Sequence, residues 1–394
     1  MRQIFDSVED STKHKKTMKF SEVIGHEELK DGLRRAVAEG RVSHALMFAG
    51  DTGCGSLAMA LAYVQYLNCT NRHDGDSCGE CASCRKIQAL EHPDLHIVMP
   101  VNKKGKKADE VILSDHFMPQ WREIVGRTGG YFTEQEWYEA IGLDNQQGNI
   151  SVGDIGEMMR KLSFKSFEAE YKAVIIWLPE RMKAEPANAM LKILEEPWDK
   201  TLFVLVSESP EMLLPTIISR TQPYRIGGVD ERSLTAKLES EGVESAKAVQ
   251  LARMSGGNLI EARRLGDGEQ DAGEYFELFV ELMRLSYNNR HLELITWAER
   301  VAKMGREPQK YFLENSVRLL RNSYMLHAGM TEICHLWGAE LEFCRKFSPF
   351  IGNDNIEKLV YEMEHALTQV RQNGNANIIF THFALTVSKL INPK

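Results

Sequence analysis

Short apolar runs alternate with amphipathic stretches over the first two-thirds of the chain. Continuous apolar runs of this length, separated by helical patterns, are typical of parallel strands that are buried on both faces. Strands are predicted at residues 44–49, 94–99, 172–178 and 202–206. Helices are predicted at residues 57–67, 151–162 and 186–196, the second of them opened by a capping-box spacing at Ser151. The pattern therefore predicts an α/β domain whose parallel sheet is covered by helices.

The pattern changes after Gly227, where strand-like runs end and helical periodicity continues to the C-terminus. Met, Phe and Leu stripes at this spacing indicate a helical core rather than cofactor contacts. Residues of about 102–149 interrupt the α/β pattern and are interpreted as an insertion. The predicted organisation is a flexible tail at residues 1–17, an α/β domain at 18–227, a small helical domain at 228–268 and a helical bundle at 269–394.

Composition and charge exclude several classes of protein. Hydrophobic residues make up 43% and charged residues 26% of the 394 positions, which excludes a disordered or fibrous chain. The net charge of −8 argues against a protein that binds nucleic acid over its whole surface. Four lysines in the insertion are interpreted as a solvated turn, with nucleic-acid contact as the alternative. They are Lys103, Lys104, Lys106 and Lys107.

The sequence also predicts a cellular location. No apolar run approaches the roughly 18 residues that a bilayer requires, and the polar N-terminus has no apolar signal core. We therefore expect a cytoplasmic protein. Because that compartment is reducing, the seven cysteines are not interpreted as a disulfide framework.

Residues 50–57 read Gly-Asp-Thr-Gly-Cys-Gly-Ser-Leu, directly after one predicted strand and before a predicted helix. This is the position of a phosphate-binding loop, in which glycines let backbone N–H groups surround the phosphates. The glycines of that frame are present at Gly50, Gly53 and Gly55. However, Ser56 stands where the loop needs a lysine for the β- and γ-phosphates, and Leu57 stands where it needs a hydroxyl for magnesium.

The acidic element that should accompany such a loop is also missing. In phosphate-loop ATPases a later strand ends in an aspartate that holds magnesium. Here that strand carries Trp177, and an indole cannot bind magnesium. Three losses at separate positions remove the same chemistry, so we expect no ATP binding at this chain's own site. The alternative that stays open is weak nucleotide binding without hydrolysis.

Four cysteines follow the spacing C-x8-C-x2-C-x2-C, at Cys69, Cys78, Cys81 and Cys84. Four thiolates without an open coordination position are typical of structural zinc. Two alternatives stay open: uncoordinated thiols, and an iron–sulfur cluster, although Gln88 stands where the fourth ferredoxin cysteine would be. The remaining cysteines, Cys54, Cys334 and Cys344, are expected to be buried apolar thiols.

Five segments occur in the order found in a known family. Besides the cysteine module they are VIGHEELKDGL at 23–33, RVSHALMFAG at 41–50, NAMLKILEEP at 188–197 and LLPTIISRTQ at 213–222. Together they resemble bacterial clamp-loader subunits, which are AAA+ proteins of the DNA polymerase III gamma/delta-prime group. The resemblance covers most of residues 18–265. It implies an AAA+ domain, a small helical lid and a C-terminal helical collar, and the four cysteines correspond to the family's zinc ligands.

Within this group the degenerate loop resembles the delta-prime branch rather than the gamma/tau ATPases. The family's second nucleotide-sensing arginine would fall near Ile260 and is missing too. One motif survives, because Ser219 and Arg220, followed by Thr221, match the family's Ser-Arg-Cys signature. In the family this arginine projects into the ATP site of the neighbouring subunit. The resemblance thus implies a non-catalytic subunit that supplies Arg220 in trans as an arginine finger.

The resemblance also implies partners: ATPase subunits of the gamma/tau type, a delta subunit, and the sliding clamp and primed DNA reached through the whole assembly. Two alternatives stay open, namely an ATPase with unconventional nucleotide residues and a zinc-dependent DNA-binding module. Glu195 and Glu196 could be read as a catalytic pair, but neighbouring helical positions point about 100° apart. We interpret them as a structural helix end near a subunit boundary.

Overall fold

The computed structural model describes residues 18–102, 112–143, 147–266, 270–331, 334, 336 and 338–392. It divides into two compact units, the first ending at Arg263 and the second beginning at Arg264. The predicted tail at 1–17 and the four lysines of the insertion lie outside the described residues. Among the described helices, none combines the length and hydropathy needed to cross a bilayer.

The first unit is built on a five-stranded parallel sheet in the order β2-β3-β4-β1-β5. Its strands are β1 (Ala45–Ala49), β2 (Leu95–Val98), β3 (Lys172–Trp177), β4 (Thr201–Ser207) and β5 (Gln222–Arg225). The four strands expected from apolar runs are all present, so the α/β class is confirmed. The edge strand β5 was not predicted because its sequence is polar and largely exposed.

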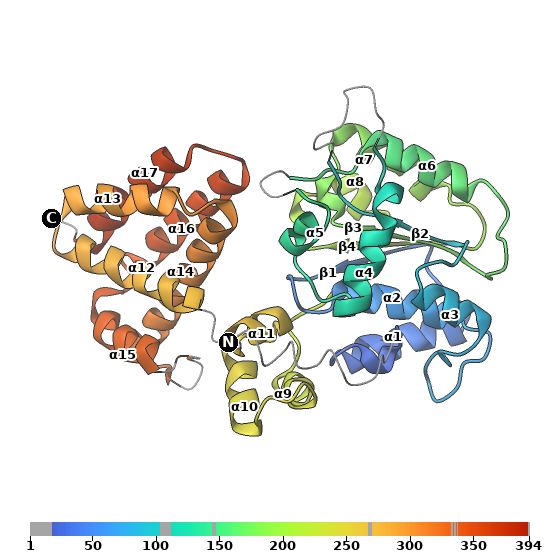
Figure 1. Ribbon diagram of the computed structural model, residues 1–394, viewed down its shortest axis with the longest axis horizontal. Helices are drawn as coiled ribbons and strands as arrows, with labels where there is room; N and C mark the ends of the chain where they lie inside the picture. Colours follow the sequence, from blue (N-terminus) through green and yellow to red (C-terminus); the bar gives the residue numbers. More distant parts are fainter. Residues whose placement is uncertain are drawn as a thin grey trace. The chain divides into compact units, whose positions relative to one another are not determined.

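Helices cover both faces of this sheet, as Figure 1 shows with α6 and α7 above the strands and α1 and α2 below them. The helices of this part are α1 (Glu27–Ala38), α2 (Ser56–Leu67), α3 (Ala82–Gln88), α4 (Met118–Thr128), α5 (Glu134–Ala140), α6 (Val152–Leu162), α7 (Ala184–Glu195) and α8 (Pro215–Ile218). Short 3-10 turns occur at Phe20–Glu22, Ser114–Phe117, Pro179–Arg181 and Pro210–Met212. Every residue of α2 is buried, because this helix packs directly on the sheet.

Successive side chains of a strand point to opposite faces of the sheet, and this alternation determines which helices they contact. Val174 and Ile176 of β3 share a core cluster with Phe203 and Leu205 of β4 and with apolar residues of α6 and α7. Intervening positions of the same strands point to the opposite face. The capping box predicted for α6 is confirmed, because Ser151 Oγ accepts from the Asp154 N–H at 3.2 Å while the Asp154 carboxylate accepts from the Ser151 N–H at 2.9 Å.

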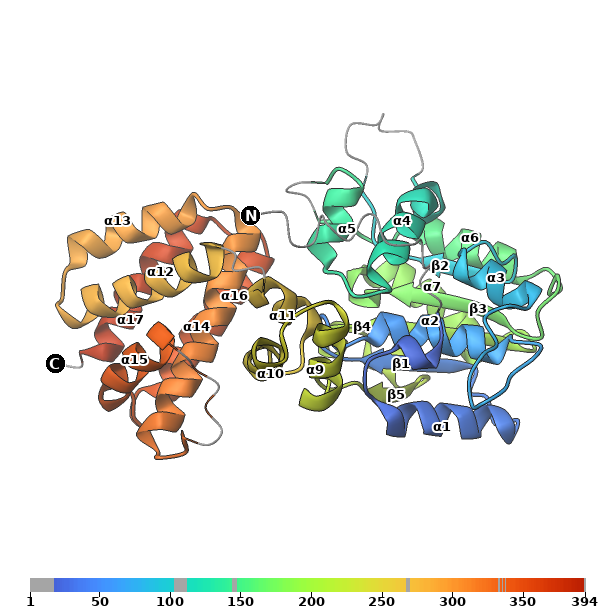
Figure 2. The same cartoon turned by 60° about the horizontal axis from the view of Figure 1, so that its bottom comes forward.

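Three short helices follow β5 and lie together in Figure 2, and the last of them extends past Arg263. They are α9 (Glu231–Ser240), α10 (Ser245–Met254) and α11 (Leu259–Gly266). Asp230 opens α9 by accepting a hydrogen bond from the Ser233 N–H at 2.9 Å. The peptide N–H of Leu259 donates to Gly53 O at 3.3 Å, which ties α11 to the loop after β1.

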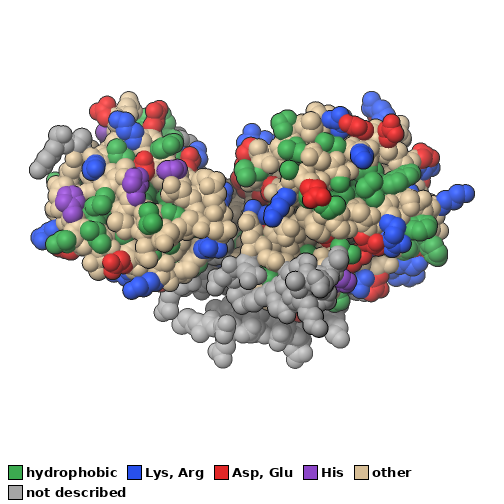
Figure 3. All heavy atoms as spheres, turned by 90° about the horizontal axis from the view of Figure 1, so that it is seen from above, with side chains coloured by type: hydrophobic (Ala, Val, Ile, Leu, Met, Phe, Trp, Pro, Cys, Tyr) green, Lys and Arg blue, Asp and Glu red, His purple; other side chains and the backbone are tan. Residues whose placement is uncertain are grey.

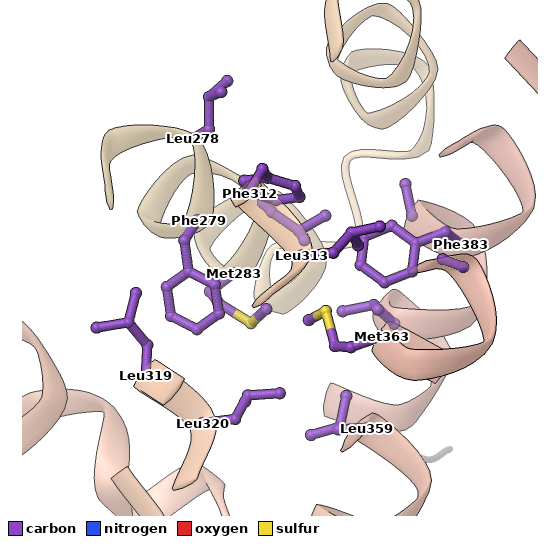
Figure 4. Close-up of a cluster of buried hydrophobic side chains, with 14 of the residues drawn as sticks. Leu278, Phe279, Met283, Phe312, Leu313, Leu319, Leu320, Leu359, Met363 and Phe383 are labelled. Carbon is purple, nitrogen blue, oxygen red and sulfur yellow. The ribbon is translucent and has the colours of Figure 1, made fainter. Parts of the chain in front are cut away.

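The second unit is entirely helical in its described residues. Its helices are α12 (Gln270–Tyr287), α13 (His291–Ala302), α14 (Arg306–His327), α15 (Gly338–Phe347), α16 (Ile356–Arg371) and α17 (Ala376–Ile391), with a 3-10 turn at Ser348–Phe350. Figure 4 shows Phe279, Phe312, Met363 and Phe383 converging on one core from different helices. The expectation that the Met, Phe and Leu stripes form core is confirmed.

Candidate functional site

The candidate phosphate loop lies between β1 and α2, as its sequence predicted. Gly53 and Gly55 have φ of +80° and +99°, a left-handed conformation that glycine adopts without strain. Ser56 and Leu57 form the first turn of α2 and are 6% and 4% exposed. The glycine conformations are compatible with the predicted phosphate-loop frame, in which Ser56 and Leu57 replace the expected lysine and hydroxyl.

Side chains from distant elements close over this loop. A Cβ at Gly53 would lie 2.0 Å from Asn258 Oδ1, and a Cβ at Gly55 would lie 2.8 Å from the Tyr131 hydroxyl. Tyr131 is held in place because its hydroxyl accepts from the Ile24 N–H at 3.1 Å. The loop needs glycine at these two positions because the side chains of Asn258 and Tyr131 pack directly against its backbone.

Aromatic packing occupies the end of β3, where an ATPase would carry its magnesium-binding aspartate. Trp177 is 2% exposed, and its ring centroid lies 5.2 Å from Trp121 and 5.2 Å from Phe132. Trp121 in turn packs at 5.0 Å against Trp137. Trp121 and Trp137 come from α4 and α5, so the described part of the predicted insertion fills this end of the sheet. An apolar cluster of this kind offers no ligand to a hard cation.

Two carboxyl groups near the loop were missed by sequence reasoning. Glu180 accepts hydrogen bonds from Ser207 Oγ at 2.9 Å and from the N–H groups of Glu208 and Ser209 at 2.8 and 3.1 Å. Burial raises the pKa of Glu208 to about 8, a hydrogen bond with Thr52 of the loop opposes that shift, and the nearby Glu180 adds to it. Neither carboxyl group can supply the positive charge that the phosphates of a nucleotide require.

The raised pKa of Glu208 makes stability depend on pH. In the unfolded chain a glutamate titrates near its ordinary pKa of about 4.3, whereas in the folded protein Glu208 holds its proton up to about pH 8. Between these values the folded state binds more protons, so stability falls as pH rises. Glu208→Gln should therefore stabilise the protein by about 1–3 kcal/mol at pH 9 and much less at pH 5. Thermal unfolding at both pH values, with the exposed Glu211→Gln as control, checks this; an equal effect at both pH values would contradict it.

A cavity of about 820 Å³ lies beside the loop in the first unit. Its walls come from the segment before α1 and from α2, α4 and α9, with apolar positions such as Ile24, Ala58 and Val125. Among the described residues, its lining includes none of positions 50–57. Lysine and arginine side chains, Arg122 among them, also line the cavity, so it offers space for a small molecule beside positive charge.

The four cysteines predicted as metal ligands converge at the end of α2 and the start of α3. Their Sγ atoms lie within 4.8 Å of one another, with Cys69–Cys78 and Cys78–Cys84 separations of 3.6 and 3.9 Å. Sulfurs placed 2.3 Å from a tetrahedral ion lie about 3.8 Å apart, so the cluster fits zinc. Backbone N–H groups donate to these sulfurs, for example Cys81 N–H to Cys78 Sγ at 3.3 Å. Burial opposes ionisation of Cys81, but hydrogen bonds from Thr70 and from the Cys84 N–H lower its pKa to about 6.

The other cysteines only partly match expectation. Cys54 and Cys344 are 2% and 0% exposed, as predicted for buried thiols. Cys334 is half-buried instead, and its Sγ lies 3.3 Å from Met330 O, so the expectation of a buried thiol is wrong there. The reason is its position outside the regular helices of the second unit, between α14 and α15.

The cysteine module also holds the segment that precedes α1. The Asp76 carboxylate accepts hydrogen bonds from the N–H groups of Phe20 at 3.1 Å and Ser21 at 2.9 Å. Arg34 of α1 donates to Gly75 O at 2.6 Å. The loop between the first two cysteines therefore fastens the start of the described chain to the domain.

Arg220 follows α8 and precedes β5, at the edge of the sheet. Its Nη1 donates to Thr216 O at 2.9 Å and its Nη2 donates to the carboxylate of Glu195. The side chain remains 33% exposed. Ser219 is the C-cap of α8, and the Thr221 hydroxyl donates to Ile218 O at 3.0 Å. The helix end that the sequence predicted at Glu195 is thus in contact with the candidate finger.

The sequence of this chain is similar to subunits of bacterial DNA polymerase III. A family model described as "DNA polymerase III, delta subunit" matches residues 25–230, more than half of the chain. DNA polymerase III subunit delta' of Bacillus subtilis is 29% identical over 61% of this chain and 59% of its own length. The delta' subunit of Haemophilus influenzae is 28% identical over 66% of this chain and 69% of its own length.

Relatives named gamma/tau and solved structures also match this chain. DNA polymerase III subunit gamma/tau of Mycobacterium tuberculosis is 27% identical over 61% of this chain, which spans only 35% of that relative. A solved gamma subunit-related protein from Thermotoga maritima is 15% identical and covers 92% of this chain and 99% of its own. The TM-score of that match is 0.34.

Proposed function

Because this chain belongs to the family described as DNA polymerase III, delta subunit, we propose that it is a non-catalytic, delta-prime-like subunit of a replicative clamp loader. The predicted AAA+ domain with helical regions after it agrees with that membership. One observation carries the proposal: the loop between β1 and α2 has glycines but lacks the lysine, the hydroxyl and the aspartate that nucleotide chemistry requires.

The proposal assigns a role to each part of the chain. Residues 18–227 form the AAA+ domain, 228–268 the lid and 269–394 a collar that holds the ring together. Its partners are gamma/tau-type ATPase subunits and a delta subunit, and it reaches the sliding clamp and primed DNA through the whole cytoplasmic assembly. These partners are supported by relatives that carry the names of delta' and gamma/tau subunits.

Arg220 is the residue that connects this subunit to catalysis. A guanidinium is always charged and can bind phosphate oxygens with two parallel hydrogen bonds. Partial exposure at the edge of the sheet leaves Arg220 accessible to a neighbouring molecule. We assign it as an arginine finger, with Ser219 as its motif neighbour, acting on ATP bound by the adjacent subunit.

The cysteine cluster has a structural role in this proposal. Zinc bound by Cys69, Cys78, Cys81 and Cys84 would leave no open position for a reacting group. Its contribution is stability, because it holds the loop that carries Asp76 and through it the segment at Phe20 and Ser21.

ATP turnover of the isolated chain tests the proposal. We expect no turnover by the chain alone, no tight ATP binding, and strong stimulation when it joins ATPase subunits of the gamma/tau type. The measurement is phosphate release, with and without each component. Turnover by the isolated chain would favour an ATPase with an unconventional site.

Tight, steeply salt-dependent DNA binding by the chain alone would favour a zinc-dependent DNA-binding module instead. The surface argues against that outcome. On the face drawn in Figure 3, Lys and Arg side chains are interspersed with Asp and Glu. The net charge of −8 also argues against tight DNA binding by the chain alone.

A further inference from the structure

The contact between Arg220 and Glu195 points to a function for a carboxylate that the family match leaves unassigned. We propose that Glu195 is a positioning residue, which holds the Arg220 guanidinium in the orientation that meets a neighbouring subunit's phosphate. This inference rests on the proposed in-trans role of Arg220. It concerns how the finger is presented, and not whether the finger exists.

Arg220 is anchored at two points and still accessible. Its Nη1 donates to Thr216 O at 2.9 Å, and its Nη2 donates to the Glu195 carboxylate. These bonds use two of the five N–H donors of a guanidinium. With 33% of the side chain exposed, the group is oriented by the protein while part of its surface remains open to an incoming anion.

Both anchors stand on rigid elements. Glu195 is the last residue of α7, and the two residues before it, Ile193 and Leu194, are buried in the core between α7 and the sheet. Thr216 belongs to α8, where Ile217 is fully buried in the same core. Because the two helices are fixed by packing, the guanidinium is held between fixed points instead of sampling its many rotamers in solvent.

The neighbouring Glu196 provides a matched comparison. It is exposed and forms the C-cap of α7 with φ of −128° and ψ of 73°, so the chain leaves the helix there. Within the described part of the chain, Glu195 forms an ion pair with Arg220 and Glu196 does not. The two carboxylates are chemically identical and adjacent, and only one of them contacts the finger.

An alternative interpretation is that Glu195 restrains Arg220 and so inhibits its action. A carboxylate could keep the guanidinium away from phosphate, in which case its removal would raise turnover. Two features favour positioning: the anchors leave donors unused, and the second anchor, Thr216 O, is a neutral acceptor that does not compensate the arginine's charge.

The test is ATP turnover of the reconstituted loader with clamp and primed DNA. Glu195→Ala is expected to lower kcat by about two- to fivefold, the range over which an exposed ion pair shifts a population, with KM for ATP unchanged. Glu195→Gln keeps an acceptor oxygen, so its kcat should fall less than that of Glu195→Ala. Glu196→Ala should match wild type, and Glu195→Ala should add nothing in an Arg220→Ala background.

Each other result overturns the inference in a recognisable way. Unchanged or raised turnover in Glu195→Ala, while Arg220→Ala is still defective, removes Glu195 as a positioning residue and leaves the finger intact. A loss that persists in the Arg220→Ala background shows that Glu195 acts elsewhere. If Arg220→Ala itself has normal turnover, the proposed function fails at its finger and the positioning role falls with it.

Discussion

Replacement of Arg220 by alanine is expected to lower ATP turnover at the neighbouring subunit's site by about 10³-fold or more. An arginine finger supplied in trans is worth about 10³ to 10⁵ in rate, because it stabilises charge that develops on the transferred phosphoryl group. This chain contributes no lysine or magnesium ligand of its own, so its effect on turnover depends on that one cation. The measurement is phosphate release by the reconstituted loader with clamp and primed DNA.

Two variants serve as controls for this prediction. Arg232→Ala removes an exposed arginine of α9 and should leave turnover unchanged. Arg220→Lys keeps the charge but not the planar fork, and should recover only part of the loss. Size-exclusion chromatography must show that each variant still joins the assembly. Normal turnover in an intact Arg220→Ala assembly would reduce this residue to a structural role.

Loss of the metal is expected to have the largest effect on stability. Structural zinc contributes about 10–16 kcal/mol of apparent binding free energy in small zinc-folded peptides. Cys84 is fully buried at the centre of the cluster, so Cys84→Ser should abolish metal binding and lower the free energy of unfolding by about 5 kcal/mol or more. Metal content by elemental analysis and thermal unfolding of the full chain measure both effects.

The same experiment distinguishes zinc from its alternatives. Cys54→Ser changes a buried thiol outside the cluster and should keep full metal content with only a small loss of stability. A strong chelator should destabilise wild type but not Cys84→Ser. Hydrogen exchange at the amides of Phe20 and Ser21 should increase on metal loss, because Asp76 is their acceptor. Visible absorbance with bound iron would indicate an iron–sulfur cluster, and absence of metal would contradict a metal site.

Several features followed from local sequence because their physical cause is local. Continuous apolar runs predicted four of the five strands, since a strand buried on both faces must be apolar throughout. The Ser151 capping box and the cysteine spacing were predicted for the same reason, as both depend on residues close together in the chain. Ser56, Leu57 and Trp177 predicted the absence of the lysine, the hydroxyl and the aspartate that a phosphate loop uses.

Two features of the fold, strand β5 and the packing of the insertion, could not be predicted from local sequence. Strand β5 pairs with β1 through backbone hydrogen bonds, and its polar sequence gives no periodic signal. The sequence pattern sets the insertion apart from the α/β domain, yet its Trp121 and Trp137 are fully buried in the aromatic cluster at Trp177. Burial there is decided by residues far away in sequence, which a local window cannot register.

The sequence by itself determined the α/β class and the four-cysteine cluster, and it predicted a degenerate phosphate loop and an arginine motif at Arg220. Only the tertiary structure decided what surrounds them: Asn258 and Tyr131 over the loop, Glu208 beside it and Glu195 on Arg220. The physical reason is the same in each case. Residue type and spacing determine what chemistry is available, whereas parallel-sheet connections bring together side chains that no short stretch of sequence contains.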